Sequence, residues 1–369
     1  MTPGRDPGAG PPPGAHAPVR PPRRPDRATL AAQTRRENRV RQLSLILAET
    51  PAEARTVGMN PTAFVQAMLP HQEVVQRGPD GEPLVIPDGR GGTQKLLAEH
   101  YAAHNGEYRL VLRAGLRRGP SHLHPQVSRG IPYGGLARLL LAFIVTEAKT
   151  KKSRTIDLGR TLTAFCEKID VTPSGGANGR LRYVVDQVQR LATCAVTWEW
   201  DAYTPGRRDL QGENLFVVES YHFWHQAATP SREPIDGGSI TLSQAFWDNV
   251  VSDCFPLDFR KAQLFRARPT AYDLYLWLTY RLATLQISGK PSVTVNYDQL
   301  HAQLGSHYQS DGAGTLTPRG KKDFGYEVRR ALKAIAAAWP ALRYETPRGR
   351  IRLYNTGPDV EYRPSRASA

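Results

Sequence analysis

Cysteine is scarce in this 369-residue chain: Cys166, Cys194 and Cys254 are its only cysteines, and they lie far apart. An odd number of cysteines without a Cys-x-x-Cys pair argues against a disulfide framework and against a zinc ribbon. No apolar run approaches the length of a membrane span. No apolar core follows the charges at the N-terminus, so we expect neither a membrane partner nor a secretory signal. A cytoplasmic protein in a reducing compartment fits these absences best.

Acidic residues are also in the minority. The chain has 34 Asp and Glu against 49 Lys and Arg, which gives a formal net charge of +15 and a pI of about 9.9. Such an excess favours a polyanionic partner, because each phosphate that a cation neutralises releases condensed counterions. The alternative is a basic protein whose charge serves only solubility. The clustering of the basic residues on particular segments favours DNA.

The sequence lacks the motifs of a nucleotide hydrolase. Gly320 and Lys321 come closest to a phosphate-binding loop, but Thr315 stands where the earlier glycine is needed and Lys322 stands where Ser or Thr should follow. No pair of carboxylates is set in a catalytic context. We therefore expect no catalytic residue and no cofactor.

Two pairs of histidines raise the question of a metal. His122 and His124, in GPSHLHPQ, match the His-hydrophobic-His pair that holds a metal in rolling-circle nickases. That pair needs a central strand and a nearby nucleophilic tyrosine, whereas here it lies in a Pro-flanked loop with no such tyrosine after it. His222 and His225 have no carboxylate or cysteine to complete a metal site. We expect no metal, and a metal-dependent site-specific nickase stays as the alternative from the enzyme class.

The chain carries the same order of segments twice. The first copy starts at Tyr133 with an apolar helix, followed by an extended piece, a helix, a Gly-rich break, a basic helix and a Trp-bearing strand. The second copy starts near Thr270, follows the same order and ends in a hairpin. Helix, strand, two helices and a β-hairpin is the order of a winged helix, a helix-turn-helix with an added wing. We therefore expect an α+β, mainly helical chain with two tandem winged-helix domains.

Composition sets the expected boundaries. Residues 1–28 form an Arg/Pro-rich basic arm that we expect to be disordered, because it cannot bury enough apolar surface to offset the entropy of ordering. Residues 29–129 are expected to be a helical and hairpin region. The pattern from Thr29 to Leu69 is mostly helical, with interruptions at Pro51 and Pro61, and GEYRLVLRAGL is expected to be a strand. The remaining units are the first winged-helix domain with a connecting strand and helix (130–255), the second winged-helix domain (256–356) and a tail (357–369).

The helix expected over residues 180–192 has two unlike faces. At helical spacing, one face collects Leu181, Val184, Val185, Val188 and Leu191. The opposite face and its flank carry Arg182, Tyr183, Asp186, Gln189 and Arg190. In a helix-turn-helix the first face packs on the domain and the second faces the major groove. An ordinary amphipathic surface helix would show the same pattern, and its repetition in the second copy favours DNA.

The second copy gives the same arrangement over residues 322–336. The face expected to be buried consists of Phe324, Val328, Ala331, Ile335 and Trp339. The hairpin that follows carries Arg343, Arg348, Arg350 and Arg352 around a Pro-Arg-Gly turn, with Glu345 as the one acidic residue. Arginines on a hairpin suit a wing that rests on phosphates or enters a minor groove. The expected first wing is YTPGRRDLQGEN, with Arg207 and Arg208.

Together these patterns predict a DNA-binding surface without a metal. The expected DNA-contacting residues are Ser153, Arg154, Arg180, Arg182, Tyr183, Gln189, Arg190, Arg207, Arg208, Lys321, Lys322, Tyr326, Arg329, Arg330, Lys333, Arg348, Arg350 and Arg352. The two basic helices would enter successive major grooves, and the wings with Ser153 and Arg154 would contact phosphates.

One stretch of the sequence closely resembles the C-terminal family of plasmid-encoded RepA replication initiators. The landmarks of the first half are Pro132 to Gly134, Ala137 to Leu140, Thr146 to Ala148, Ser153 and Arg154, Ile156 to Gly159, Phe165, Gly175 and Gly176, and Gln187 to Leu191. Those of the second half are Ala271 to Leu282, Gln299 to His301, Gln303 to Gly305 and Val328 to Ala336. The resemblance covers about residues 130–356, and the chain departs from the family at Lys149 to Lys152 and in the Arg/Pro-rich arm.

The resemblance implies a plasmid replication initiator. Such a protein binds repeated origin sequences (iterons) in double-stranded DNA, helps open the adjacent AT-rich DNA and recruits host replication proteins such as helicase or primase. It also implies a possible homodimer that represses its own promoter. A transcription repressor with no replication role would read DNA with the same helices, so this alternative stays open.

Overall fold

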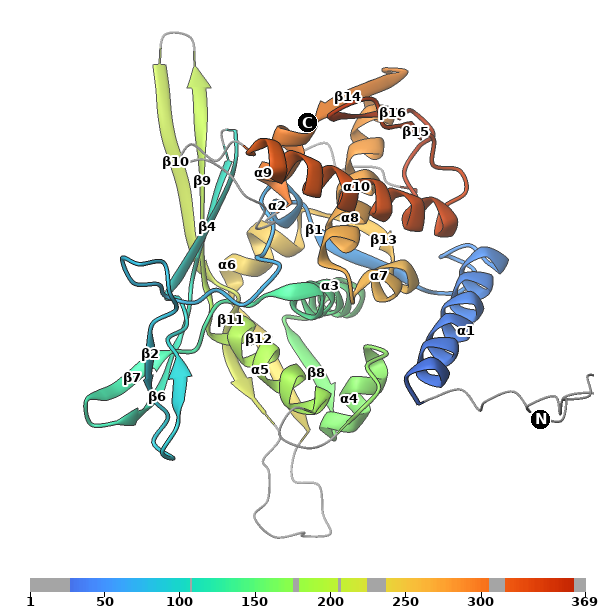
Figure 1. The fold of residues 1–369 in the computed structure, drawn as a ribbon. Coiled ribbons are helices and arrows are strands. Elements are labelled where there is room, and N and C mark those ends of the chain that lie inside the picture. The colour runs from blue at the N-terminus through green and yellow to red at the C-terminus, as the bar shows by residue number, and fades with distance from the viewer. Residues whose placement is uncertain are drawn as a thin grey trace, which may run out of the picture. The chain divides into compact units, whose positions relative to one another are not determined.

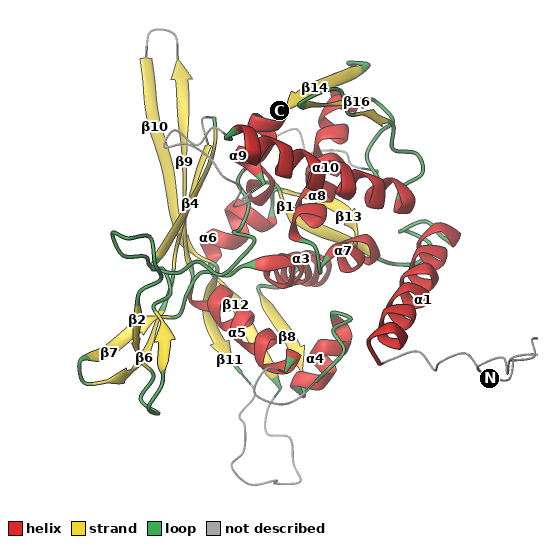
Figure 2. Ribbon diagram, viewed as in Figure 1, coloured by secondary structure: helices red, strands yellow, loops and turns green. Residues whose placement is uncertain are grey.

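The computed structural model describes residues 27–106, 108–174, 179–204, 207–223, 237–304 and 316–361. The contacts divide the chain into two units, residues 1–42 and residues 43–369. Most of helix α1 (Arg27–Ala48) lies in the first unit. The expected disordered arm lies almost wholly outside the described residues. The mixture of helices and strands confirms the expected α+β class (Figures 1 and 2).

The segment after α1 is not the helical stretch that the sequence predicts. Strand β1 (Val57–Pro61) pairs antiparallel with β13 (Cys254–Asp258), so that Val57 lies opposite Asp258. Only the short helix α2 (Ala63–Gln66) follows. The helical prediction is wrong here because a partner strand far along the chain supplies hydrogen bonds that local sequence does not reveal. This pairing also places the expected boundary between residues 255 and 256 inside β13.

Three hairpins make up the rest of the N-terminal region. The first two are β2 (Val85–Pro87) with β3 (Thr93–Lys95), and β4 (His100–Asn105) with β5 (Tyr108–Arg113). The third is β6 (Leu116–Ser121) with β7 (His124–Ser128). Strand β5 falls where the sequence predicts a strand, and it also pairs with β9 (Ala195–Thr204).

The two expected copies share one order of elements. The first copy runs through α3 (Gly134–Lys151), β8 (Thr155–Gly159), α4 (Leu162–Lys168) and α5 (Arg180–Thr193). The second runs through α8 (Pro269–Ile287), β14 (Ser292–Asn296), α9 (Tyr297–Gln303) and α10 (Pro318–Ala338). Between the copies lie α6 (Gln244–Phe246), a π-helical turn η1 (Trp247–Val251) and α7 (Phe259–Phe265).

The sheets correct the predicted wing of the first copy. In the second copy, β14 pairs with β16 (Arg350–Tyr354) and β16 pairs with β15 (Tyr344–Glu345). In the first copy, β8 pairs with β12 (Gly238–Leu242), and β12 pairs with β11 (Val218–His222). The counterpart of the β15–β16 hairpin is therefore β11–β12. The predicted wing instead forms β9 and β10 (Arg207–Phe216) in the separate sheet β10-β9-β5-β4.

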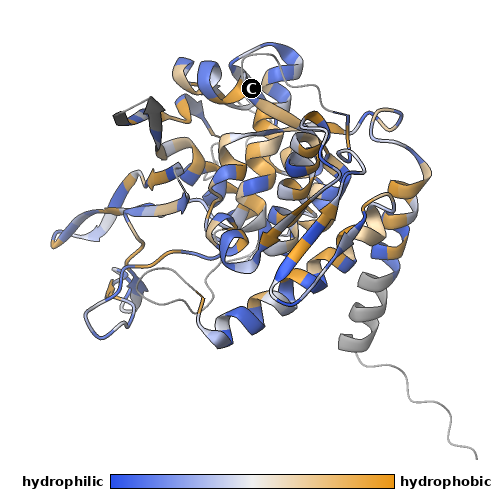
Figure 3. Ribbon diagram, turned by 90° about the horizontal axis from the view of Figure 1, so that it is seen from above, coloured by the Kyte–Doolittle hydropathy of each residue, from blue (hydrophilic) through white to orange (hydrophobic). Residues whose placement is uncertain are grey.

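Among the described residues, one hydrophobic core draws on elements from Ile46 to Leu353, and α3 and α8 each contribute many residues to it. Both helices are apolar on almost all sides, because each is packed on by other elements all round. Figure 3 shows hydrophobic residues gathered in the central helices and strands. Within the described residues, no helix has the length and apolarity that crossing a membrane requires.

One buried ion pair joins the two central helices. The Arg138 guanidinium on α3 binds the Asp273 carboxylate on α8, with Nη2 2.7 Å from Oδ2. Arg138 also donates to the carbonyl oxygens of Pro70 and Gly134, at 3.1 and 2.9 Å. His71 Nε2 lies 2.8 Å from Asp273 Oδ2. Burial lowers the pKa of His71, although Asp273 opposes that shift.

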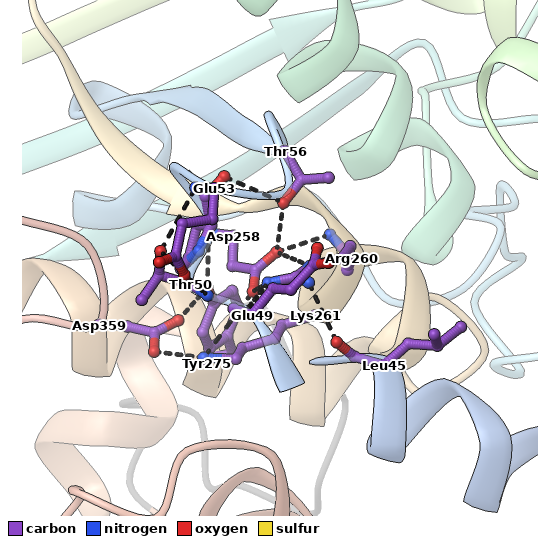
Figure 4. Close-up of polar contacts among 11 residues, drawn as sticks. Leu45, Glu49, Thr50, Glu53, Thr56, Asp258, Arg260, Lys261, Tyr275 and Asp359 are labelled. Atoms are coloured by element: carbon purple, nitrogen blue, oxygen red, sulfur yellow. Dashed lines mark hydrogen bonds and ion pairs between the residues drawn. The ribbon is translucent and has the colours of Figure 1, made fainter. Parts of the chain in front are cut away.

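A second polar cluster fastens the end of the described chain (Figure 4). The Tyr275 hydroxyl donates to Asp359 at 2.7 Å and accepts from the Asp258 backbone N–H at 2.9 Å. Lys261 forms an ion pair with Asp359, and Arg260 forms one with Asp258 at 3.0 Å. Burial raises the pKa of Asp359, while Lys261 acts in the opposite direction. Residues near 359 are therefore held against β13, α7 and α8.

Candidate nucleic-acid interface

Helix α10 carries six Lys and Arg residues, and its sequence explains where it begins. The Thr317 hydroxyl caps it by accepting from the Gly320 backbone N–H at 3.1 Å, and Pro318 occupies its first turn. Its inner face is buried as predicted, at Phe324, Val328, Ala331, Ile335 and Trp339. This apolar face anchors the helix, so its opposite side is directed outward.

The outward side of α10 carries cations at helical spacing. Lys322, Tyr326, Arg329 and Lys333 are all exposed, and Tyr326 as a residue is 61% accessible. Their spacing of three or four residues puts them on one stripe. Within the described residues Lys322, Arg329 and Lys333 form no ion pair. These cations therefore have no internal carboxylate to compete with an external anion.

Three other cations of α10 do have partners. Lys321 Nζ lies 2.9 Å from Asp298 on α9, and Arg330 Nη1 lies 2.8 Å from Glu327. Arg319 lies 3.8 Å from Asp323. All three pairs are at least partly exposed and contribute little to stability. Of the predicted residues, Lys321 and Arg330 are thus engaged in ion pairs next to the stripe. The cations of the stripe itself form no ion pair among the described residues.

The β15–β16 hairpin joins the same surface through Tyr297. The Tyr297 backbone N–H donates to the Gly349 carbonyl at 2.9 Å, in the turn of the hairpin. The Tyr297 ring packs against Phe324 of α10, with ring centroids 5.9 Å apart. The hairpin turn and the N-terminal half of α10 therefore meet at one residue. The exposed arginines on this hairpin are Arg343, Arg348, Arg350 and Arg352.

Helix α5 differs from α10 because some of its polar side chains are buried and bound within the protein. Arg190 was predicted to face outward, and this is wrong: its side chain is only 5% exposed. It lies 2.5 Å from Glu73 and 2.8 Å from Asp186, donates to the Ile131 carbonyl at 3.2 Å and lies 5.1 Å from the Tyr133 ring centroid. A segment from before α3 covers this side of the helix. Burial raises the pKa of Asp186, and Arg190 opposes that shift.

The other predicted residues of α5 divide into two groups. Gln189 is partly buried and accepts from Arg129 at 2.6 Å, and Tyr183 packs on Tyr133 with ring centroids 5.9 Å apart. Arg180 and Arg182, at the N-terminal end of the helix, are exposed. The outward surface of α5 is therefore confined to its first turn. In Figure 1, α5 and α10 lie on either side of α3.

The remaining predicted residues lie elsewhere. Ser153 and Arg154 lie between the end of α3 and the start of β8. Arg154 donates to Glu219 at 2.7 Å and to the Leu242 carbonyl at 2.9 Å. That contact braces the sheet β11-β12-β8. Arg207 and Arg208 begin β10, and their side chains lie outside the described part of the chain.

The predicted histidine pair lies on a hairpin turn. His122 and His124 flank Leu123 at the end of the two-stranded β6–β7 hairpin, not on a central strand. Within the described ranges, no group of three or more His, Cys, Asp or Glu side chains is placed to hold a metal ion. His225 is outside those ranges.

Sequence reasoning missed one contributor to the α10 surface and one basic hairpin elsewhere. Tyr297 was not singled out, although it connects the hairpin turn with α10. The β6–β7 hairpin was considered only for its histidines. A signal was present in the sequence, because no Asp or Glu occurs between Glu107 and Glu147.

Part of the chain matches the model of a known protein family. Residues 131–299 match the family model RepA_C, described as plasmid encoded RepA protein. The match confirms the resemblance there and stops short of residue 356. A crystal structure of domains 2 and 3 of RctB is similar at 10% identity and a TM-score of 0.40, covering 72% of this chain and 92% of that one. A second crystal structure of RctB domains 2–3 is similar at 9% identity and a TM-score of 0.36, covering 79% of this chain and 97% of that one. No curated protein matches.

Proposed function

We propose that this chain is a plasmid replication initiator that binds repeated origin sequences in duplex DNA, because its residues 131–299 match the family model of plasmid encoded RepA proteins. The two copies, α3 to β12 and α8 to β16, act as winged-helix modules in this proposal. Two observations support the winged-helix assignment. The copies share one order of elements, and in each copy the strand after the first helix (β8 or β14) pairs with the last strand of a hairpin (β12 or β16).

One observation carries the proposal furthest: the exposed stripe of Lys322, Tyr326, Arg329 and Lys333 on α10. An α-helix fits the major groove of B-form DNA, where arginine and lysine recognise guanine edges. The adjoining hairpin brings Arg348 and Arg350 to the same surface, where they suit phosphate contacts. The second copy is therefore the principal reader of sequence.

The first copy plays a smaller part in sequence reading. On its helix α5 the exposed cations are Arg180 and Arg182, at the first turn, whereas Arg190 is buried. The N-terminal end of a helix is also the part of a recognition helix that contacts base edges. We infer that α5 approaches DNA by this end and that Arg190 positions the helix from inside.

The initiator role comprises the further steps that the family implies: opening of adjacent AT-rich DNA and recruitment of host helicase or primase. Dimerisation for repression of its own promoter belongs to the same proposal. No catalytic residue takes part. The nickase alternative requires His122 and His124 on a central strand, and their place on a hairpin turn argues against it.

The experiment is footprinting of the full chain on the origin of its own replicon. Protection of repeats over about two helical turns supports the use of both modules, and protection over one turn limits the claim to one module. Competition with a scrambled duplex of equal length tests specificity. Loss of plasmid replication on deletion of the gene distinguishes an initiator from a repressor, since a repressor's deletion leaves replication intact. A nicked, protein-linked product with Mg²⁺ or Mn²⁺ would establish the nickase instead.

A further inference from the structure

The β6–β7 hairpin, residues 116–128, carries features that the proposed function does not use. We call it the finger. Its turn is formed by His122 and Leu123, and Leu123 as a residue is 88% exposed. Exposure of a single leucine is ordinary by itself. Here, however, the leucine stands at the tip of a hairpin rich in cations.

The charge of the finger is all of one sign. Arg117 and Arg118 lie on β6, and Arg113 and Arg129 lie just outside its two ends. No acidic residue occurs anywhere from Tyr108 to Thr146. Such a surface repels cations and attracts a polyanion. Leu116 is also 56% exposed, but it lies at the base of the hairpin, opposite Ser128, whereas Leu123 lies at the turn. The two leucines therefore form no continuous apolar face of the kind on which a protein helix docks.

The finger is held in place at both its tip side and its base. Arg117 Nη2 donates to Gln94 on β3 at 3.1 Å. The turn of the neighbouring hairpin packs against the finger, since a Cβ atom on Gly89 would lie 2.9 Å from the Pro120 carbonyl oxygen. Asp88, the carboxylate of that turn, is occupied by the backbone N–H groups of Arg90 and Gly92, each at 2.8 Å. The finger is therefore preorganised, and the nearest acid in that turn is bound internally.

The base of the finger is tied to α5. Arg129, directly after β7, donates to Gln189 of α5 at 2.6 Å. Arg190 of the same helix donates to the Ile131 carbonyl at 3.2 Å. Figure 1 shows the finger beside α5, on the side of the chain away from α10. The finger thus lies beside the first module, whose helix α5 exposes fewer cations than helix α10 of the second module.

We propose that the finger is an additional DNA-binding element, in which Arg118 contacts phosphates and Leu123 enters the minor groove of duplex DNA beside the α5 module. Apolar side chains that enter the minor groove wedge between base steps and kink the duplex. Arginine near a narrowed minor groove gains from its enhanced negative potential. The inference rests on the proposed DNA-binding function and deepens it by adding a site that bends DNA.

The first test places a cutting reagent at the tip. Cys166, Cys194 and Cys254 are all buried, so a Leu123→Cys variant of the full chain can be labelled selectively with iron–EDTA. On the footprinted origin duplex, we expect cleavage on both strands with the 3′ offset that marks a minor groove. Ile287→Cys is the control, because Ile287 is also an exposed aliphatic residue and lies at the end of α8. It should give no such cleavage pattern. Absence of cleavage from Leu123→Cys in a complex that still footprints would overturn the inference.

The second test removes the side chains. Leu123→Ala should bind the origin duplex about tenfold more weakly, as expected for the loss of one buried leucine contact, and should bend it less in a circular-permutation gel. The variants Leu123→Ala and Arg118→Ala should both melt like the unmodified chain, because Leu123 and Arg118 are exposed. Arg118→Ala should lower the salt slope of binding by about one. Wild-type affinity and bending in Leu123→Ala would reject the wedge.

The outcomes separate the two proposals. If the unmodified chain gives no footprint, the DNA-binding function itself fails. If it footprints and Arg329→Ala weakens binding while the finger variants do not, the function stands and the finger is not part of it. If Leu123→Ala binds and bends DNA normally but blocks origin opening with purified host replication proteins, the finger contacts a protein, and the minor-groove inference is wrong.

Discussion

Arg138 and Asp273 occupy the same position, the fifth residue, in α3 and α8, and they form a buried ion pair with each other. Their side chains are 4% and 1% exposed. Matching positions of the two copies thus meet across the middle of the molecule. The pair fixes how the two central helices contact each other, and through them how α5 and α10 are presented.

Breaking this pair should cost much more than breaking a surface pair. Asp273→Asn leaves the Arg138 guanidinium buried without a counter-charge, which is expected to lower the free energy of unfolding by about 3–5 kcal/mol. Urea unfolding followed by circular dichroism measures it. The double substitution Arg138→Leu with Asp273→Leu should recover part of the loss, because no charge is then left unpaired. A single variant as stable as the unmodified chain would contradict the assignment.

Stability should also depend on pH through His71. Burial lowers its pKa in the folded state, so the unfolded chain binds a proton first as the pH falls. Neutral His71 contributes fully to the free energy of unfolding when the pH is above the unfolded-state pKa of about 6.5. This contribution is lost as the pH falls from that value through the lower folded-state pKa. Unfolding curves between pH 5 and 8 should show this decline. His71→Gln, which keeps a donor for Asp273, should show a shallower decline over that window.

Arg329 should be a main determinant of sequence specificity. Arg329→Ala removes an exposed guanidinium with no ion pair among the described residues, and we expect a loss of about 1–3 kcal/mol in binding the cognate repeat. Discrimination against base changes should fall at one position of the repeat. Quantitative gel shifts with single-base variants measure both effects. Arg330→Ala is the matched control on the same helix, and its ion pair with Glu327 predicts a smaller effect.

The hairpin arginines should act without sequence preference. Arg350→Ala and Arg352→Ala should each reduce the slope of log affinity against log salt by about one and weaken cognate and non-cognate duplexes alike. Arg109→Ala removes the same charge from β5, where Arg109 is 58% exposed and pairs with Glu199, and should leave the slope unchanged. If the hairpin variants alter base preference instead, the hairpin reads sequence.

Gly325 should resist a substitution that helices ordinarily welcome. Alanine is favoured over glycine by about 1 kcal/mol within a helix. At this position, however, the added Cβ would lie 2.7 Å from Tyr297 Cε2. Gly325→Ala should therefore destabilise the fold and weaken DNA binding, because Tyr297 also holds the hairpin turn. Thermal melting and gel shifts measure the two effects, and combining it with Tyr297→Leu should restore part of the stability.

The periodic pattern of α10 was enough to predict which of its residues are buried and which are exposed. The same reasoning failed for Arg190, because periodicity gives the face toward the helix's own domain and does not reveal that Tyr133 and Glu73 cover the other face. It failed again for the first wing. The β9–β10 hairpin is nearer to α5 in sequence, but β9 pairs with β5, and the strand that pairs with β8 comes later.

The pairing of β1 with β13 has a consequence for synthesis of the chain. Val57 pairs with Asp258, so 258 − 57 = 201 residues separate the partners. At a ribosomal rate of about 5–20 residues per second, β1 waits roughly 10–40 s for its partner strand to be made. An unpaired strand edge is prone to aggregate during such an interval. Slowing translation between the two strands should therefore lower the soluble yield, even though the finished protein is unchanged.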